Sequence, residues 1–209
     1  MKSLINAFKF AKLSGVTWKA LIFELIPAII GGINVSLFDS LINQMIGMMI
    51  LEIMPMILHS LYGQIMDSKL FHTAPQRREL QINSNNAYYA FLVVVVKVLE
   101  IGILVTLFIT GKMSAQNLSY IMINTSVTTV LFALFTVFLR KQGVLAFVTF
   151  MLEIPWFVFS LKCSTLLMQP LTIAIIIFIL GAIIGCVVYG IITIVTYKMP
   201  LTSGYEQTT

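Results

Sequence analysis

Long apolar runs divide the chain into segments of membrane-spanning length. A transmembrane helix needs about 20 predominantly apolar residues, whereas a transmembrane strand is about half as long and alternates. The runs in this chain are continuous, and they predict six helical spans at residues 20–38, 41–65, 88–111, 118–139, 143–161 and 170–196. The pattern therefore predicts an all-α integral membrane protein with a single transmembrane domain over residues 1–209.

The composition agrees with a bilayer as the solvent. The chain is 59% hydrophobic and 10% charged, whereas soluble domains carry about 25% charged residues. Cys163 and Cys186 are too few for a disulfide framework or a zinc cluster. The N-terminal residues include lysines but no short apolar stretch closed by a small-residue cleavage site, so we expect no removable signal peptide.

Basic residues predict the orientation of these spans. With six spans, one side of the membrane receives ten of the 13 lysines and arginines, and Lys97 lies within a span. The ten are Lys2, Lys9, Lys12, Lys19, Lys69, Arg77, Arg78, Arg140, Lys141 and Lys198. Only Lys112 and Lys162 fall on the other side. The positive-inside rule makes the richer side cytoplasmic, with both termini inside. Because the basic residues are scattered at segment ends, they do not indicate a nucleic-acid partner.

Two segments outside the spans are long enough to form structure at the inner face. In residues 1–16, Leu4, Phe8 and Ala11 share one helical face and the lysines lie towards another. This pattern favours a helix lying flat at the interface, and the alternative is an unstructured basic leader. The loop at 66–87 is the one sizeable inner connection, and residues 197–209 form a cytoplasmic tail.

Five charged residues fall inside or at the edge of the predicted spans, where an uncompensated charge costs about 2.5 kcal/mol or more. They are Glu24, Glu52, Lys97, Glu100 and Glu153. The i, i+3 spacing of Lys97 and Glu100 predicts an ion pair. Each of the other three glutamates shortly precedes a proline, so we expect a kinked helix and a protein-lined or wet site. Two interpretations stay open. Glu52, Glu100 and Glu153 form a proton relay or a cation site, in a substrate pathway that also includes Lys97, or these glutamates make structural hydrogen bonds between helices.

Other motifs bear on packing and chemistry. Gly181 and Gly185 form a GxxxG pattern in the last span, which permits close helix packing within the chain or at a dimer face. His59 and His72 lack the neighbouring ligands of a metal site. The chain contains neither HExxH nor GxSxG, so we predict no metal site and no catalytic site in it.

The stretch FHTAPQRREL (71–80) and the arrangement around it resemble a known family. A basic N-terminal interface helix, six spans with both ends inside, minimal outer loops and one enlarged inner loop are similar to the permease subunits of bacterial type-2 ATP-binding-cassette (ABC) exporters. The inner loop of such permeases often carries a short motif containing proline, arginine and glutamate. This chain supplies Thr73, Pro75, Arg77, Arg78 and Glu79.

The resemblance implies a cytoplasmic elbow helix at about Ser3 to Ser14 and a coupling helix within Asp67 to Ser84 that docks on a separate ATPase subunit. ATP and Mg would bind to that ATPase, and this chain would bind no cofactor itself. A second permease subunit, identical or related, would complete a translocase in the bacterial cell membrane, in contact with lipid. Its substrate would be amphipathic or hydrophobic, for example a peptide.

The residues of the loop fit that role, although other interpretations remain. Pro75 suits the first turn of a short helix, Glu79 lies where negative charge is favoured, and Arg77 and Arg78 can pair with acidic groups. Alternatively, the arginines only keep the loop inside, and the chain is a stand-alone proton- or ion-coupled transporter that uses its glutamates. One departure concerns the re-entrant helices that such permeases commonly have before the last span. Here they are missing or lie within 151–169.

Overall fold

The computed structural model describes residues 2–13, 18–37, 40–59, 78–141 and 143–198. Within these ranges the backbone is helical apart from short turns, and no residue of them is in a strand. The helices are α1 (Lys2–Leu13), α2 (Trp18–Leu37), α3 (Leu41–Glu52), the π-helical segment η1 (Glu79–Ser84), α6 (Asn85–Ile109), α7 (Ala115–Lys141), α8 (Gly143–Met151), α9 (Glu153–Lys162), α10 (Ser164–Leu167), α11 (Leu171–Val195) and the short 3₁₀ helix η2 (Thr196–Lys198). The prediction of an all-α fold is confirmed for this part of the chain.

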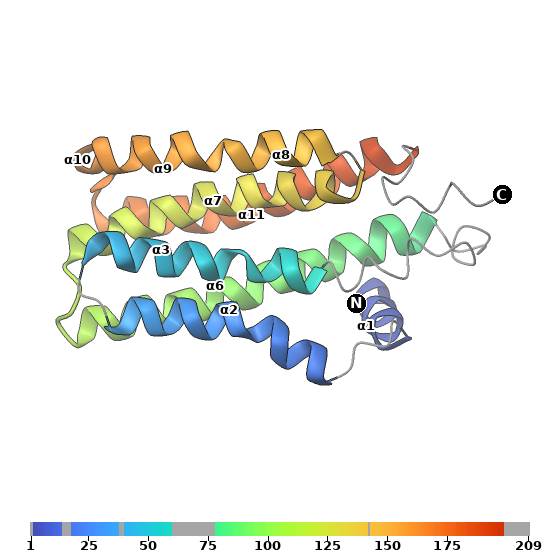
Figure 1. Ribbon diagram of the computed structural model, residues 1–209, viewed down its shortest axis with the longest axis horizontal. Coiled ribbons are helices and arrows are strands. Elements are labelled where there is room, and N and C mark those ends of the chain that lie inside the picture. Colours follow the sequence, from blue (N-terminus) through green and yellow to red (C-terminus); the bar gives the residue numbers. More distant parts are fainter. Residues whose placement is uncertain (1, 14–17, 38–39, 60–77, 142, 199–209) are drawn as a thin grey trace.

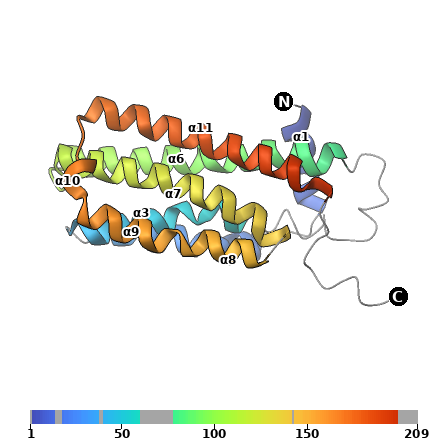
Figure 2. The ribbon, with the colours of Figure 1, turned by 90° about the horizontal axis from the view of Figure 1, so that it is seen from above.

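The long helices run lengthwise and form one bundle, and α1 lies crosswise near one end of it (Figure 1; Figure 2). At this end α2, α6 and α8 begin and α7 and α11 finish. We call it the basic end, because Arg78, Arg140, Lys141 and Lys198 lie there along the chain. At the opposite end, the short-turn end, residues 110–114 join α6 to α7 and residues 163–170 join α9 to α11.

Five helices of the described part are long and apolar enough to cross a membrane. They are Leu41–His59, Glu79–Ile109, Ala115–Leu139, Val144–Lys162 and Leu171–Val195. These five coincide with the second to sixth predicted spans. The first predicted span, 20–38, coincides with the 20-residue α2, which is not among the five, so its crossing of the bilayer remains a prediction.

The central helix of the bundle is α7. In the window of Ala115–Leu139 that would cross the membrane, 67% of residues are buried, against 22% for Val144–Lys162 and for Leu171–Val195. α7 packs against α3, α8 and, most extensively, α11. The largest cluster of buried side chains, which includes Met48, Leu104, Tyr120 and Phe178, joins α3, α6, α7 and α11. The core therefore surrounds α7.

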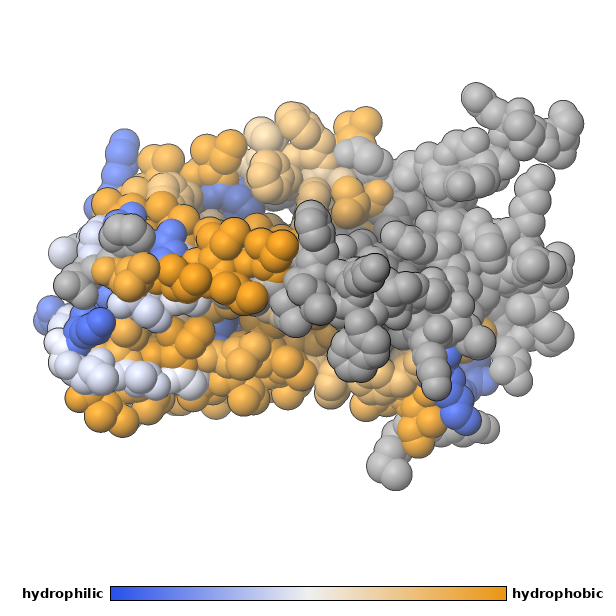
Figure 3. Space-filling model, turned by 60° about the horizontal axis from the view of Figure 1, so that its bottom comes forward, coloured by the Kyte–Doolittle hydropathy of each residue, from blue (hydrophilic) through white to orange (hydrophobic). Residues whose placement is uncertain are grey.

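The surface between the two ends is apolar. Isoleucine, valine, leucine and phenylalanine side chains of α6, α8, α9 and α11 are exposed, and Figure 3 shows apolar residues over the middle of the molecule, with hydrophilic ones gathered at the short-turn end. Soluble proteins rarely expose apolar patches larger than a few hundred Å². The surface is thus that of a membrane-embedded protein.

The helix that holds the third span begins earlier than the sequence pattern indicates. We expected residues 66–87 to be loop, with Glu79 in a separate short helix, but residues 79–84 are helical and continue directly into α6. No proline or glycine interrupts ELQINSNNAYYA, and Gln81, Ser84 and Asn85 are buried. The helix therefore extends into the C-terminal part of the predicted loop, and residues 67–77 of the proposed coupling element lie outside the described residues.

The segment before the last span is a nearly continuous helix. α8 and α9 lie end to end along the length of the bundle (Figure 1), with an irregularity where Leu152 N–H donates to both Val148 and Thr149 carbonyls at 3.2 Å. The four-residue α10 follows at the short-turn end. In the described part of 151–169 there is thus a spanning helix and one further turn, not a re-entrant pair.

Candidate functional site

A buried charge cluster lies in the bundle, where α3, α6 and α7 meet. The Lys97 ammonium of α6 pairs with Glu52 Oε1 of α3 and with Glu100 Oε2 one turn away, the latter at 2.9 Å. The Thr129 hydroxyl of α7 lies 2.8 Å from Glu52 Oε1 and 2.7 Å from the Thr125 carbonyl oxygen. The predicted Lys97–Glu100 contact is present, and Glu52 joins it from a different helix.

The cluster is shielded from both water and lipid. Glu52, Lys97 and Glu100 are 2%, 5% and 0% exposed, and the ammonium lies 4.5 Å from the centre of the Phe178 ring of α11. Two carboxylates face one ammonium, which gives a net charge of −1 when all three are ionised. Glu100 Oε1 is buried and has no hydrogen-bond partner among the described residues. The arrangement can therefore hold a proton as well as tie helices together.

Prolines explain where two of the glutamates lie along their helices. Glu52 is the last residue of α3, three residues before Pro55, and Glu153 is the first residue of α9, two residues before Pro155. Proline has no N–H and clashes with the preceding turn, so the regular helix ends just before it. The prediction of irregular helices at these two glutamates agrees with the observed breaks. The side chain of Glu24 lies outside the described part of the chain.

Glu153 does not share the hydrogen bonds of the charge cluster. It is buried, and neither carboxylate oxygen has a hydrogen-bond partner among the described residues. It lines a pocket between α3, α7, α8 and α9 that otherwise consists of apolar side chains. Of Glu52, Glu100 and Glu153, the structure brings Glu52 and Glu100 to one lysine and leaves Glu153 outside their hydrogen bonds.

Gly181 and Gly185 lie where α11 crosses α7. A Cβ atom at Gly181 would come within 2.5 Å of the Ser126 Cβ and 2.8 Å of its Cα, and one at Gly185 within 3.2 Å of the Thr129 Cγ2. Real Cβ atoms do not approach backbone this closely, so a larger residue at Gly181 would force the helices apart. The two glycines thus face the interior of this chain, next to the helix that carries Thr129.

The residues proposed for ATPase coupling are only partly described. Thr73, Pro75 and Arg77 lie outside the described residues. Arg78 is exposed at the basic end, and Glu79 begins η1. The neighbouring α1 contacts both η1 and α6, and Phe8 packs edge-on against Tyr88 and Phe91 with ring centres 5.9 and 5.1 Å apart. The N-terminal helix therefore touches the start of the third span.

A second polar group, which the sequence pattern did not indicate, joins three helices near the basic end. His59 Nε2 lies 2.6 Å from Asn85 Oδ1 and 2.7 Å from the Tyr189 hydroxyl, and Asn85 Nδ2 donates to that hydroxyl at 2.7 Å. The Tyr189 ring stacks on Tyr89 with centres 3.9 Å apart. These residues fix α6 to α11 and to the end of the second span. No spacing rule links residues 59, 85 and 189, so only the fold brings them together.

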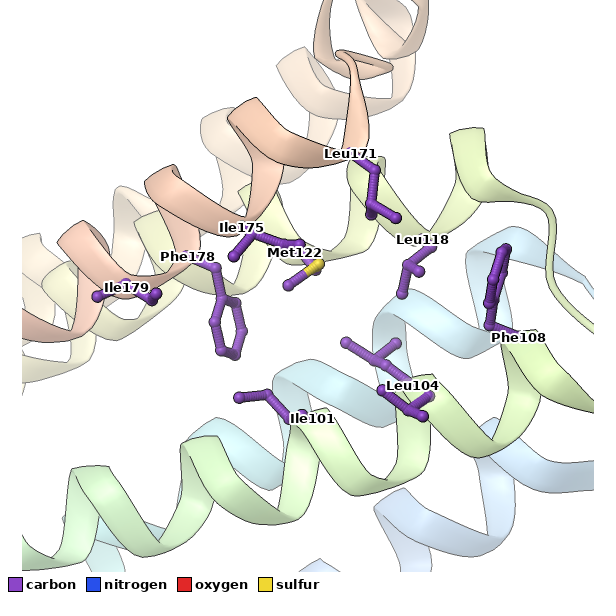
Figure 4. A pocket seen from close by; sticks show the side chains of 10 residues that line it. Ile101, Leu104, Phe108, Leu118, Met122, Leu171, Ile175, Phe178 and Ile179 are labelled. Atoms are coloured by element: carbon purple, nitrogen blue, oxygen red, sulfur yellow. The ribbon is translucent and has the colours of Figure 1, made fainter.

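An apolar pocket of about 260 Å³ lies beside the charge cluster, between α6, α7 and α11. Figure 4 shows Ile101, Leu104 and Phe108 of α6 facing Met122 and Phe178 across it. Phe178 is also the ring beside the Lys97 ammonium, so this side chain contacts both the pocket and the buried charges. The lining is suited to an aliphatic or aromatic group, and not to a polar one.

Comparison with known proteins gives no match: no family model, no curated protein and no solved structure is similar to this chain. Its function therefore has to be argued from the residues and their geometry.

Proposed function

We propose that this chain is the transmembrane permease subunit of a bacterial ABC exporter. A separate ATPase subunit would dock at the basic end, through the segment that connects α3 to α6, and would hydrolyse ATP with Mg. The permease would act with a second copy or a related subunit. It would move an amphipathic or hydrophobic substrate, such as a peptide, out of the cytoplasmic membrane.

One observation carries this proposal. The two helices on either side of the connecting segment, α3 and α6, are the same two helices that the Glu52–Lys97 pair joins in the middle of the bundle. A displacement of the segment would act on both helices together, because separating them would leave desolvated charges unpaired. Thr129 extends this connection to the central helix α7. A movement of the connecting segment, outside the membrane, would in this way be transmitted to the helices in the core of the bundle.

The position of α1 gives further support. It lies crosswise to the spans and contacts η1, which begins directly after Arg78. Ala7 is fully buried in this contact, and Phe8 and Lys9 are exposed. An apolar and basic helix at this place is typical of one that lies at a membrane interface. α1 would then hold the cytoplasmic start of the third span at the membrane surface.

Purification from the native host in mild detergent tests the proposal. We expect a nucleotide-binding subunit to co-purify with the tagged chain and to hydrolyse ATP. Reversing Arg77 and Arg78 to glutamate should lower its recovery, whereas Lys162→Glu at the short-turn end should not. Protease accessibility must show the same topology for all three proteins. Recovery that is unchanged by the arginine reversal would remove the docking role of these residues.

A second function is favoured by the excess of carboxylates over ammonium groups in the charge cluster. In a stand-alone proton-coupled transporter, the uncompensated carboxylate of Glu52 or Glu100 would load and release a proton during transport. Transport of an amphipathic or hydrophobic substrate that follows a proton gradient, in proteoliposomes containing only this chain, would support that function. The same result would contradict the dependence on an ATPase.

A further inference from the structure

The carboxyl group of Glu153 is an unusual feature of the described interior. The residue is 6% exposed, and both oxygens are buried without a hydrogen-bond partner among the described residues. Buried polar groups in folded proteins are nearly always hydrogen-bonded, and carboxylates within a membrane usually pair with another group. Trp156, one turn further along α9, likewise has a buried indole N–H without a partner. This part of α9 thus has polar groups that the described chain does not satisfy.

Glu153 lines a pocket of about 320 Å³, with its two carboxyl oxygens buried behind an almost wholly apolar lining. Its other lining residues are aliphatic side chains of the second span, together with Ile154 and the rings of Phe132, Phe150 and Phe157. The pocket borders the lipid-facing surface, since Phe150 and Ile154 are 45% and 54% exposed. A ligand can therefore reach it sideways from the bilayer.

The chemistry of this lining selects a class of ligand. Three phenyl rings can each attract a cation over their faces, and a carboxylate in low dielectric attracts it without screening by water. The volume falls near the lower end of pockets that hold small organic molecules, roughly 300–1,000 Å³. A metal ion would not suit the pocket, because hard cations need about six or more oxygen ligands. A neutral apolar molecule would leave the carboxyl group unused.

We propose that the pocket between α3, α7, α8 and α9 binds a lipophilic organic cation, with Glu153 as its counter-ion. The cation would be a quaternary ammonium or phosphonium centre, or an amine, that carries aromatic or alkyl groups. The Phe132, Phe150 and Phe157 rings would contact the apolar groups, and the charge would lie on the side of Glu153. This site needs no ATPase, so it is independent of the proposed function and can be tested on the isolated chain.

Equilibrium binding of tetraphenylphosphonium to the purified full chain in nanodiscs provides the test. We expect saturable binding that Glu153→Gln weakens roughly 30-fold or more, the loss typical when one partner of a desolvated charge pair is removed. Neutral tetraphenylsilane, which has the same shape but neither a charge nor a hydrogen-bonding atom, should bind the two proteins equally. Equal binding of the cation to both proteins, or no saturable binding to the wild type, overturns the proposal.

A second variant keeps the carboxylate and fills the space. Ile50→Trp should also abolish saturable binding, whereas Val94→Trp, on the exposed face of α6, should leave it unchanged. Circular dichroism and size-exclusion chromatography establish that each variant is folded. If Ile50→Trp binds as the wild type does, the cation is held elsewhere and the pocket is not its site.

Discussion

Replacing Lys97 with methionine is the sharpest perturbation of the buried charge cluster. Methionine keeps most of the length and the apolar stem of lysine but removes the ammonium. The change leaves Glu52 and Glu100 without their shared cation, and the Thr129 hydroxyl still lies within hydrogen-bond distance of Glu52. Because all three charged residues are at most 5% exposed, neither water nor lipid headgroups can replace the lost cation.

The magnitude follows from the pairing. Removing one partner of a buried ion pair costs about 3–5 kcal/mol of unfolding free energy, since the remaining charge stays desolvated. Glu100→Gln should cost much less, about 0.6 kcal/mol, because Lys97 keeps Glu52 and only one membrane-buried hydrogen bond is weakened. A triple variant with glutamine at both glutamates and methionine at Lys97 contains no unpaired charge, so it should recover most of the loss.

Unfolding by SDS in mixed micelles, followed by circular dichroism, measures these differences. We expect the wild type to be the most stable, followed by Glu100→Gln and then the triple variant, with Lys97→Met the least stable. The reasoning is refuted if Lys97→Met unfolds at the same SDS fraction as the wild type. It is also refuted if Glu100→Gln is less stable than Lys97→Met. Either result would mean that the ammonium does not hold the carboxylates in the folded state.

Three further changes test the packing. Gly31→Ala should destabilise the protein by about 1–3 kcal/mol, because the new Cβ would lie 2.6 Å from a backbone oxygen of α3. The adjacent Gly32→Ala is the control. Its Cβ meets nothing within 4 Å, so this change should be neutral or stabilising in the same assay. Gly181→Ala should destabilise by a similar amount, with Gly102→Ala, which also has open space, as its control. Tyr189→Phe removes the hydroxyl near His59 and should cost about 0.6–1.7 kcal/mol, with faster hydrogen exchange at the start of α6. Equal effects within either glycine pair, or unchanged exchange in Tyr189→Phe, would contradict the helix contacts described.

The length and continuity of the apolar runs located five of the spans, because a bilayer requires a minimum number of apolar residues. The same criterion did not find the N-terminal extension of the helix that holds the third span. The extension η1 is polar in sequence, but its residues Gln81 and Ser84 are buried against the protein. Local hydropathy indicates whether a segment is apolar enough to lie in lipid. It does not indicate which polar residues are buried by a neighbouring helix.

Only the contacts between residues close together in the sequence could be predicted for the candidate site. Lys97 and Glu100 lie one turn apart on one helix, so their spacing alone indicates the pair. Glu52, which precedes Lys97 by 45 positions, contacts the same ammonium. That contact depends on how α3 packs beside α6 and α7. The separation of Glu153 from this group, and the union of His59 with Asn85 and Tyr189, likewise depend on helix packing that no single-segment pattern contains.

The central claim, that a separate ATPase docks at the basic end, can be tested most directly by photo-cross-linking in native membranes. A photoreactive phenylalanine analogue is placed at Arg78, which is exposed at the basic end, or at Lys112, which is exposed in the turn at the opposite end. We predict a cross-link from position 78 to a nucleotide-binding subunit, and none to that subunit from position 112. A cross-link from position 78 to lipid alone, in membranes where protease accessibility shows the wild-type topology, would contradict the claim.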